Sequence, residues 1–181
     1  MNTPMKILYR YRGVVLGILG AVLFAFPPGS LEALPIALPL FTLSLLLRVW
    51  ARSHIGSHTR GSTHEADYLV TSGPYRWMRH PLYVSNTGFA FSLVLFHLGL
   101  TWMALPFMLA VVAFEILLAQ AENVFLKKKF GEEWDGWKNL EPNPYRISLF
   151  KAFCNDVSTW WWLLFCNLIL LVLKLVVGKI P

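Results

Sequence analysis

Long apolar runs alternate with polar segments along this chain, and the pattern predicts a bundle of about five membrane-crossing helices. About 20 apolar residues span the hydrocarbon core of a bilayer. The chain is 56% hydrophobic and 14% charged, which is more apolar surface than a soluble chain of 181 residues can bury. We therefore expect an all-α, polytopic membrane helix bundle without a Rossmann domain, formed by residues 1–181 as a single domain. The predicted spans are Tyr9–Phe26, Leu31–Leu47, Tyr83–Leu100, Trp102–Ala119 and Thr159–Val177.

The connections between these runs differ sharply in length and polarity. Pro27–Ser30 and the residues around Thr101 predict tight hairpins. Ala51–Arg79 and Lys127–Ser158 are the only polar segments long enough to build a site, so residues 51–158 carry the candidate chemistry. We expect a cofactor pocket on the side of these two segments.

The basic residues follow the same division. If the spans alternate in direction, 14 of the 16 lysines and arginines lie on the side of the two polar segments. Cytoplasmic segments of membrane proteins are enriched in lysine and arginine, so we expect a cytoplasmic N-terminus and a C-terminus on the opposite side. The membrane would be the bacterial inner membrane or the endoplasmic reticulum. The net charge of +6 then reflects topology, and no nucleic-acid partner is expected.

Two helices have ends that the sequence predicts. Pro35 and Pro39 indicate a bent or irregular start for the second span. Phe114–Phe130 contains no helix breaker before Gly131, so we expect the fourth helix to continue past the membrane.

The tripeptide Arg79-His80-Pro81 stands at the start of the third span. Proline is tolerated in the first turn of a helix, which places His80 near the N-cap with free backbone N–H groups beside it. Such a helix start attracts anions. Taken alone, Arg79 could equally be a membrane-flanking residue whose charge reaches toward water.

Glu115 and Glu122 are seven residues apart on the fourth predicted helix and therefore lie on nearly the same face. Glu115 falls within the hydrocarbon, where an ionisable group predicts a functional site. A protonated glutamate hydrogen-bonded to a neighbouring helix explains it equally well. Glu122 lies at the boundary of the membrane, where a solvated acid is ordinary.

Metal chemistry is not predicted. His54 and His58 have helical spacing and His64 follows, but no carboxylate or cysteine completes a recognisable site. Cys154 and Cys166 give neither a disulfide framework nor a metal-ligand spacing.

Two motifs stand in a fixed order in the middle of the chain. The first is Leu69-Val70-Thr71-Ser72-Gly73-Pro74-Tyr75 followed by Arg79-His80-Pro81-Leu82-Tyr83. The second is Glu122 followed by Phe130-Gly131-Glu132-Glu133-Trp134 and Trp137. Together, over roughly residues 67–137, they resemble the isoprenylcysteine carboxyl methyltransferase and phospholipid methyltransferase-like family of integral membrane enzymes.

The resemblance implies S-adenosylmethionine as cofactor. Its carboxylate suits the helix start at His80, its ammonium suits Glu122, and aromatic faces suit a sulfonium cation. Glu122 and Arg79 are the implied catalytic residues, and Glu115 is a further hypothesis, as a group that orients or deprotonates the acceptor. The family's cofactor positions correspond to Asp67, Tyr68, Leu69, Val70, Tyr75, His80, Pro81, Leu82, Tyr83 and Glu122.

The chain departs from the family pattern at three positions. Ala121 replaces the first glutamate of a pair, Ser85 replaces a glycine, and Leu118 stands where the family has a substrate-orienting arginine. Because an arginine is a carboxylate clamp, we expect an acceptor other than a prenylcysteine carboxylate. A lipophilic acceptor reached from the bilayer between helices, among membrane lipids, fits better.

Two alternatives remain open at this point. Membrane sterol and enone reductases share an Arg-His-Pro-x-Tyr-like segment but use NADPH. A non-catalytic membrane scaffold is favoured by Ala121 and Leu118. The oligomeric state is also open, since Gly13-x-x-x-Gly17 permits close helix packing either within one molecule or between two.

Overall fold

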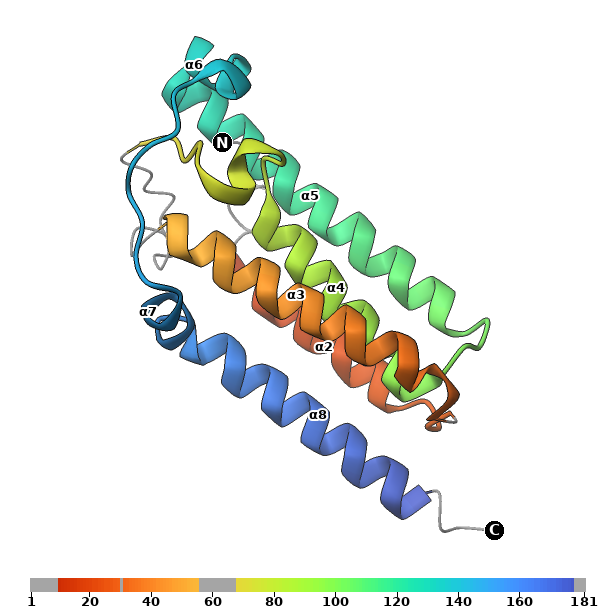
Figure 1. The fold of residues 1–181 in the computed structure, drawn as a ribbon. Helices are drawn as coiled ribbons and strands as arrows, with labels where there is room; N and C mark the ends of the chain where they lie inside the picture. The colour runs from red at the N-terminus through yellow and green to blue at the C-terminus, as the bar shows by residue number, and fades with distance from the viewer. Residues whose placement is uncertain (1–9, 30, 56–67, 178–181) are drawn as a thin grey trace.

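The computed structural model describes residues 10–29, 31–55 and 68–177, which form a bundle of long helices (Figure 1). No strand occurs among these residues, and the predicted all-α class is confirmed. Five long helices occupy the five predicted runs within the described part of the chain. They are α2 (Arg12–Phe24), α3 (Leu34–Ile55), α4 (Pro81–Leu98), α5 (Ala104–Phe130) and α8 (Val157–Val177).

Three of these segments are long and apolar enough to cross a membrane: Leu31–Ile55, Ala104–Phe130 and Val157–Val176. The apolar helix α2 is shorter, and α4, with 18 residues, packs between α3 and α5. Helix α8 exposes large apolar side chains such as Leu164, Phe165 and Leu168. An apolar exterior of this kind is stable in lipid, where helices satisfy their own backbone hydrogen bonds.

The helix ends follow the local sequence signals. A short 3₁₀ turn, η1 (Leu31–Ala33), precedes α3, and Pro39 lies inside that helix, so the predicted irregular start is confirmed. Helix α5 runs to Phe130 and stops at Gly131, which has a φ of 56°. Helix α3 continues to Ile55, well past the predicted end at Leu47.

Small polar residues hold α3 and α4 together. The Ser85 hydroxyl donates to the Ser44 carbonyl at 3.0 Å, and Ser92 donates to the Ala37 carbonyl at the same distance. A Cβ atom on Gly88 would collide with the Ser44 hydroxyl, so glycine permits the close approach. Close packing through small residues is the usual way in which helices associate within a membrane.

The two tight hairpins lie at one end of the bundle, and the polar segments lie at the other (Figure 1). At the hairpin end, the Gly29 N–H donates to the His97 carbonyl at 2.7 Å, and His97 Nε2 donates to the Phe26 carbonyl at 2.9 Å. Lys174 near the end of α8 donates to the Gly29 carbonyl at 2.6 Å. At the opposite end are the 3₁₀ turn η2 (Gly73–Arg76), the short helices α6 (Glu132–Asp135) and α7 (Leu149–Cys154), and the 3₁₀ turn η3 (Trp137–Asn139).

Candidate functional site

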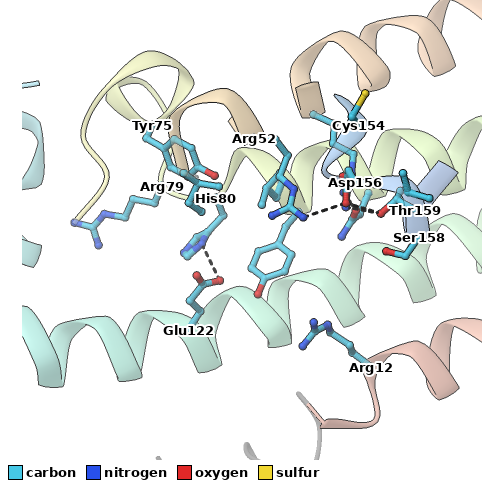
Figure 2. Close-up of a pocket in the computed structure, with 16 residues that line it drawn as sticks. Arg12, Arg52, Tyr75, Arg79, His80, Glu122, Cys154, Asp156, Ser158 and Thr159 are labelled. Atoms are coloured by element: carbon cyan, nitrogen blue, oxygen red, sulfur yellow. Dashed lines mark hydrogen bonds and ion pairs between the residues drawn. The ribbon is translucent and has the colours of Figure 1, made fainter. Parts of the chain in front are cut away.

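A cavity of about 530 Å³ lies at the polar end of the bundle, bordered by α2, α3, η2, α4, α5 and the α7–α8 junction (Figure 2). It is lined by several of the residues that the sequence predicts. Those that the structure brings together around the cavity are Tyr75, Arg79, His80, Leu82, Tyr83 and Glu122.

One end of the cavity, which we call the histidine end, is built where α4 begins beside α5. His80 is the N-cap residue and Pro81 is the first residue of α4, as the sequence predicts. His80 Nδ1 lies 3.6 Å from Glu122 Oε2, and its Nε2 donates to Asn123 Oδ1 at 2.7 Å. The His80 and Glu122 side chains are 15% and 31% exposed, so this pair is open to a ligand.

Tyr75 reaches the same cavity because its loop passes close to α3. Gly73 has a φ of 60°, a conformation suited to glycine, and a Cβ atom there would run into the His54 ring. Among the described residues the Tyr75 hydroxyl, which is buried, makes no hydrogen bond. Burial first, and then the Glu122 charge, raise the pKa of Tyr75. The hydroxyl therefore stays protonated and can donate a hydrogen bond.

Arg79 borders the cavity but directs its charge elsewhere. Its guanidinium lies 4.5 Å from the centre of the Trp134 ring and 5.6 Å from that of Trp137. It also donates to the Trp134 carbonyl at 3.3 Å. Figure 2 shows Arg79 pointing away from Glu122. These contacts fasten the α6–η3 segment against the start of α4.

Four other predicted cofactor residues do not line the cavity. Pro81 is buried at the start of α4. The segment of Tyr68, Leu69 and Val70 packs against the segment before α7, where Asn143 Nδ2 donates to the Leu69 carbonyl at 2.9 Å. The Tyr68 and Tyr145 rings lie 6.2 Å apart at the same junction. Asp67 lies outside the described residues.

The opposite end of the cavity, which we call the arginine end, was not predicted from the sequence. Asp156, just before α8, accepts from Arg48 Nε at 2.5 Å and from Arg52 Nη2 at 3.1 Å. Arg48 also donates to Asn86 Oδ1 at 2.6 Å and to Thr159 Oγ1 at 2.9 Å. Burial raises the pKa of Asp156, but the two guanidinium groups outweigh it and hold that pKa below its usual value.

The sequence contains a signal for this cluster. Arg48 and Arg52 are one helical turn apart on an otherwise apolar helix, and Asp156 immediately precedes the last apolar run. Charges in such positions face the bundle interior and pair with one another. Because of this pairing, the two arginines near the polar end of α3 remain inside the protein, with side chains that are 12% and 11% exposed.

Glu115 lies outside the cavity wall, within the packed helices. Its side chain is 4% exposed and hydrogen-bonds to Asn86, which in turn accepts from Arg48. Glu115 and Glu122 therefore both contact groups at the α4 side of α5, as their seven-residue spacing predicts.

The substituted positions on α5 are packing positions. Leu118 is 1% exposed and Ala121 is 0% exposed, and neither lines the cavity. The arginines that line the cavity come from α2, from α3 and from the loop before α4.

The histidines and cysteines of the described residues do not form a metal-binding cluster. Within the described ranges, no group of three or more His, Cys, Asp or Glu residues could hold a metal ion. His54 Nδ1 lies 2.9 Å from the Ser72 hydroxyl, which secures the loop before Tyr75. His58 and His64 lie outside the described residues. Cys154 is exposed, Cys166 is part-buried, and neither forms a disulfide.

A family model described as phospholipid methyltransferase matches residues 33–133, more than half of the chain. No curated protein and no solved structure matches the chain. The matched residues contain the start of α4 with His80 and the part of α5 with Glu122. This chain therefore belongs to the phospholipid methyltransferase family of membrane methyltransferases.

Proposed function

We propose that this protein transfers a methyl group from S-adenosylmethionine to a lipophilic acceptor that enters from the bilayer. The observation that carries the proposal is the meeting of His80, Glu122, Tyr75 and Tyr83 around one cavity at the polar end of a membrane bundle. The family match supports methyl transfer over the NADPH-dependent reduction that the Arg-His-Pro segment alone leaves open.

The residues at the histidine end fit the cofactor's chemical groups. Glu122 supplies a carboxylate for the ammonium, and the start of α4 with His80 suits a carboxylate because backbone N–H groups and the helix dipole favour anions there. The buried Tyr75 hydroxyl is a donor in need of an acceptor. The cavity volume lies within the usual range for small-molecule sites.

When bound, S-adenosylmethionine supplies an electrophilic methyl group on a sulfonium. The protein's own contribution is alignment and exclusion of water, which suffice for a direct displacement. Tyr83 lies beside His80, with ring centroids 5.5 Å apart, and offers an aromatic face to a cation. Arg79 acts by holding the α6–η3 segment in place.

Glu115 acts in this proposal as a positioning residue. Because it hydrogen-bonds to Asn86 and does not line the cavity, it orients the Asn86 amide rather than removing a proton from the acceptor. If a Glu115→Gln variant kept full turnover with every accepted substrate, Glu115 would have no positioning role in the reaction.

The acceptor is proposed to be a membrane amphiphile. The family description names phospholipids, and these are the first acceptors to test. The cavity borders on α8, whose remaining surface carries exposed apolar side chains that suit contact with lipid.

The polar end of the bundle is proposed to face the cytoplasm, as the distribution of lysine and arginine predicts. Cys154 is exposed at this end and offers a natural probe. A membrane-impermeant maleimide should label it from the cytoplasmic side only, and a Cys154→Ser variant should remove that label. Labelling from the opposite side would reverse the orientation.

The first test is calorimetric titration of the detergent-purified protein with S-adenosylmethionine and, separately, with NADPH. Saturable binding of S-adenosylmethionine that weakens in Glu122→Gln is the expected result. Glu133→Gln is the matched control, because Glu133 is exposed on α6 and lies outside the cavity wall. Binding of NADPH alone would instead support a reductase, and binding of neither would support a scaffold.

A further inference from the structure

The arginine end of the cavity carries an excess of positive charge. At this end Arg12, Arg48 and Arg52 line the cavity, whereas the carboxylate in the same part of its wall is Asp156. The excess persists when Glu115, which lies beneath the wall and hydrogen-bonds to Asn86, is counted as a second carboxylate. A cavity lined with one sign of charge between apolar helices attracts ligands of the opposite sign.

These arginines converge from different helices. Arg48 and Arg52 lie on α3, with side chains that are 12% and 11% exposed, and Arg12 reaches toward the cavity from the start of α2 (Figure 2). Guanidinium groups are planar, permanently charged donors that match the oxygens of phosphates and carboxylates. Their placement beside one cavity provides several such donors for a single ligand.

The start of α8 adds to the same wall. Val157, Ser158 and Thr159 line the cavity, so the N-terminal end of a 21-residue helix borders it. That end of a helix carries a partial positive charge. The Thr159 hydroxyl is already engaged with Arg48 and Asp156, whereas the Ser158 hydroxyl is exposed beside it.

Much of this end lies outside the segment that matches the family. The match covers residues 33–133, so Arg12 before it and Asp156 to Thr159 after it are features of this chain's own flanking helices. Leu118, where the resemblance predicts an arginine, is buried in packing. Positive charge at the arginine end therefore comes from α2 and α3.

We propose that Arg12, Arg52 and the first turn of α8 form the site for the phosphate group of the lipid acceptor, with Arg48 and Asp156 holding that wall together. This role as an acceptor site rests on the proposed function. A bound S-adenosylmethionine has a net positive charge, from one carboxylate against an ammonium and a sulfonium. An anionic acceptor group at the arginine end then offsets both that charge and the arginines.

The test compares a lipid that carries a phosphate with the same lipid without it and with phosphate alone. The detergent-purified full chain is titrated with dioctanoyl phosphatidic acid, with dioctanoyl glycerol and with inorganic phosphate. We expect phosphatidic acid to bind at least about tenfold more tightly than either of the others, because the site needs both the anion and the acyl chains. The affinity should also fall as salt concentration rises.

Arg12→Gln and Arg52→Gln test the residues, and each should weaken phosphatidic acid binding about tenfold while S-adenosylmethionine affinity stays unchanged. Arg10→Gln and Arg146→Gln are the matched controls, since both residues are exposed and lie outside the cavity wall. Melting curves of all four variants establish that they are folded. Arg48 is left intact because its three contacts join α3, α4 and α8.

Several outcomes would overturn the inference. Equal affinities for phosphatidic acid and dioctanoyl glycerol would show that the site does not recognise the phosphate. Equally tight binding of inorganic phosphate would show that the site does not recognise the lipid chains. Arginine variants that lose S-adenosylmethionine affinity would assign the arginine end to the cofactor. Failure of S-adenosylmethionine to bind, with arginine-dependent lipid binding intact, would overturn the proposed function while leaving the phosphate site.

Discussion

The two ends of the cavity use charged residues in opposite ways. At the arginine end, contacts of 2.5–3.1 Å join Arg48, Arg52 and Asp156, and the side chains are 3–12% exposed. At the histidine end, His80 and Glu122 lie 3.6 Å apart, and Glu122 is 31% exposed. A buried charge cluster is costly to disturb, whereas a partly exposed ionic contact contributes little to stability.

This difference in burial and pairing distinguishes residues that hold the helices together from residues that are placed to bind a ligand, although both line one cavity. Asp156 connects α8 to α3, helices whose contacting residues are 108 positions apart in the sequence. The 3.6 Å contact between His80 and Glu122 joins the start of α4 to α5, two helices that follow each other in the chain. We therefore expect the loss of Asp156 to act on stability first, and substitutions at the histidine end to act on ligand affinity first.

The largest effect is expected from Asp156→Asn. The substitution leaves the Arg48 and Arg52 charges buried without a carboxylate, and breaking a buried pair in this way costs about 3–5 kcal/mol of unfolding free energy. Thermal melting in detergent measures the loss. The control is Asp135→Asn, because the Lys127–Asp135 pair is 63% and 58% exposed and such pairs contribute about 0–1 kcal/mol. Equal losses in the two variants would contradict the comparison.

The same cluster predicts a pH dependence. Because the folded-state pKa of Asp156 is below its ordinary value of 3.8, the carboxylate's stabilising contribution is complete above about that pH. It is lost as the pH falls through the lower folded-state pKa. The difference in melting temperature between the wild type and Asp156→Asn should therefore stay constant from pH 7 to 5 and narrow below pH 4. A difference that narrows between pH 7 and 5 would assign the effect to another group.

Leu118→Arg should have the next largest effect, and it is expected to destabilise the protein without creating an anion site. Leu118 is 1% exposed and lies away from the cavity wall, so the new charge would enter packed helices. A charged residue within a membrane helix costs about 3 kcal/mol. The measurement is the melting temperature together with phosphatidic acid affinity, and Leu118→Met is the control. A folded Leu118→Arg protein with tighter lipid binding would show that the position faces the ligand.

Glu122→Gln should change stability little and S-adenosylmethionine affinity about tenfold, which corresponds to about 1.4 kcal/mol. The carboxylate is partly exposed and its contact with His80 is long, so the folded protein loses little. Melting curves and calorimetric titration of the same preparation separate the two quantities. A large fall in melting temperature with unchanged affinity would make Glu122 a structural residue.

Gly73→Ala should destabilise the protein by about 1–2 kcal/mol, because a residue with a Cβ atom is strained at a positive φ. Gly73 has a φ of 60°, and an added Cβ would press against the His54 ring that faces Ser72. Because this loop carries Tyr75 into the cavity, ligand affinity should fall slightly as well. Gly136→Ala, at a φ of −90° and with the nearest heavy atom 3.5 Å from the added Cβ, is the control. Equal melting temperatures for wild type and Gly73→Ala would show that the loop adjusts.

The sequence alone predicts much of the histidine end. Pro81 determines where α4 begins and so makes His80 its N-cap residue. The uninterrupted run before Gly131 extends α5 past Glu122, and the seven-residue spacing places Glu115 and Glu122 on one face. These are local rules of helix geometry, so they hold whatever the helices pack against.

The arginine end depends on tertiary structure. No local sequence pattern predicts that Arg48 and Arg52 contact Asp156, that Leu118 is buried, or that the Arg79 side chain points toward Trp134. Those outcomes follow from which helix faces come together and from the high cost of leaving a charge unpaired among apolar helices. The sequence by itself determined the long helices, the start of α4, the end of α5 and the side of the bundle on which polar groups gather. Only the packing of the helices decided that Asp156 joins α8 to α3 and which charged side chains line the cavity.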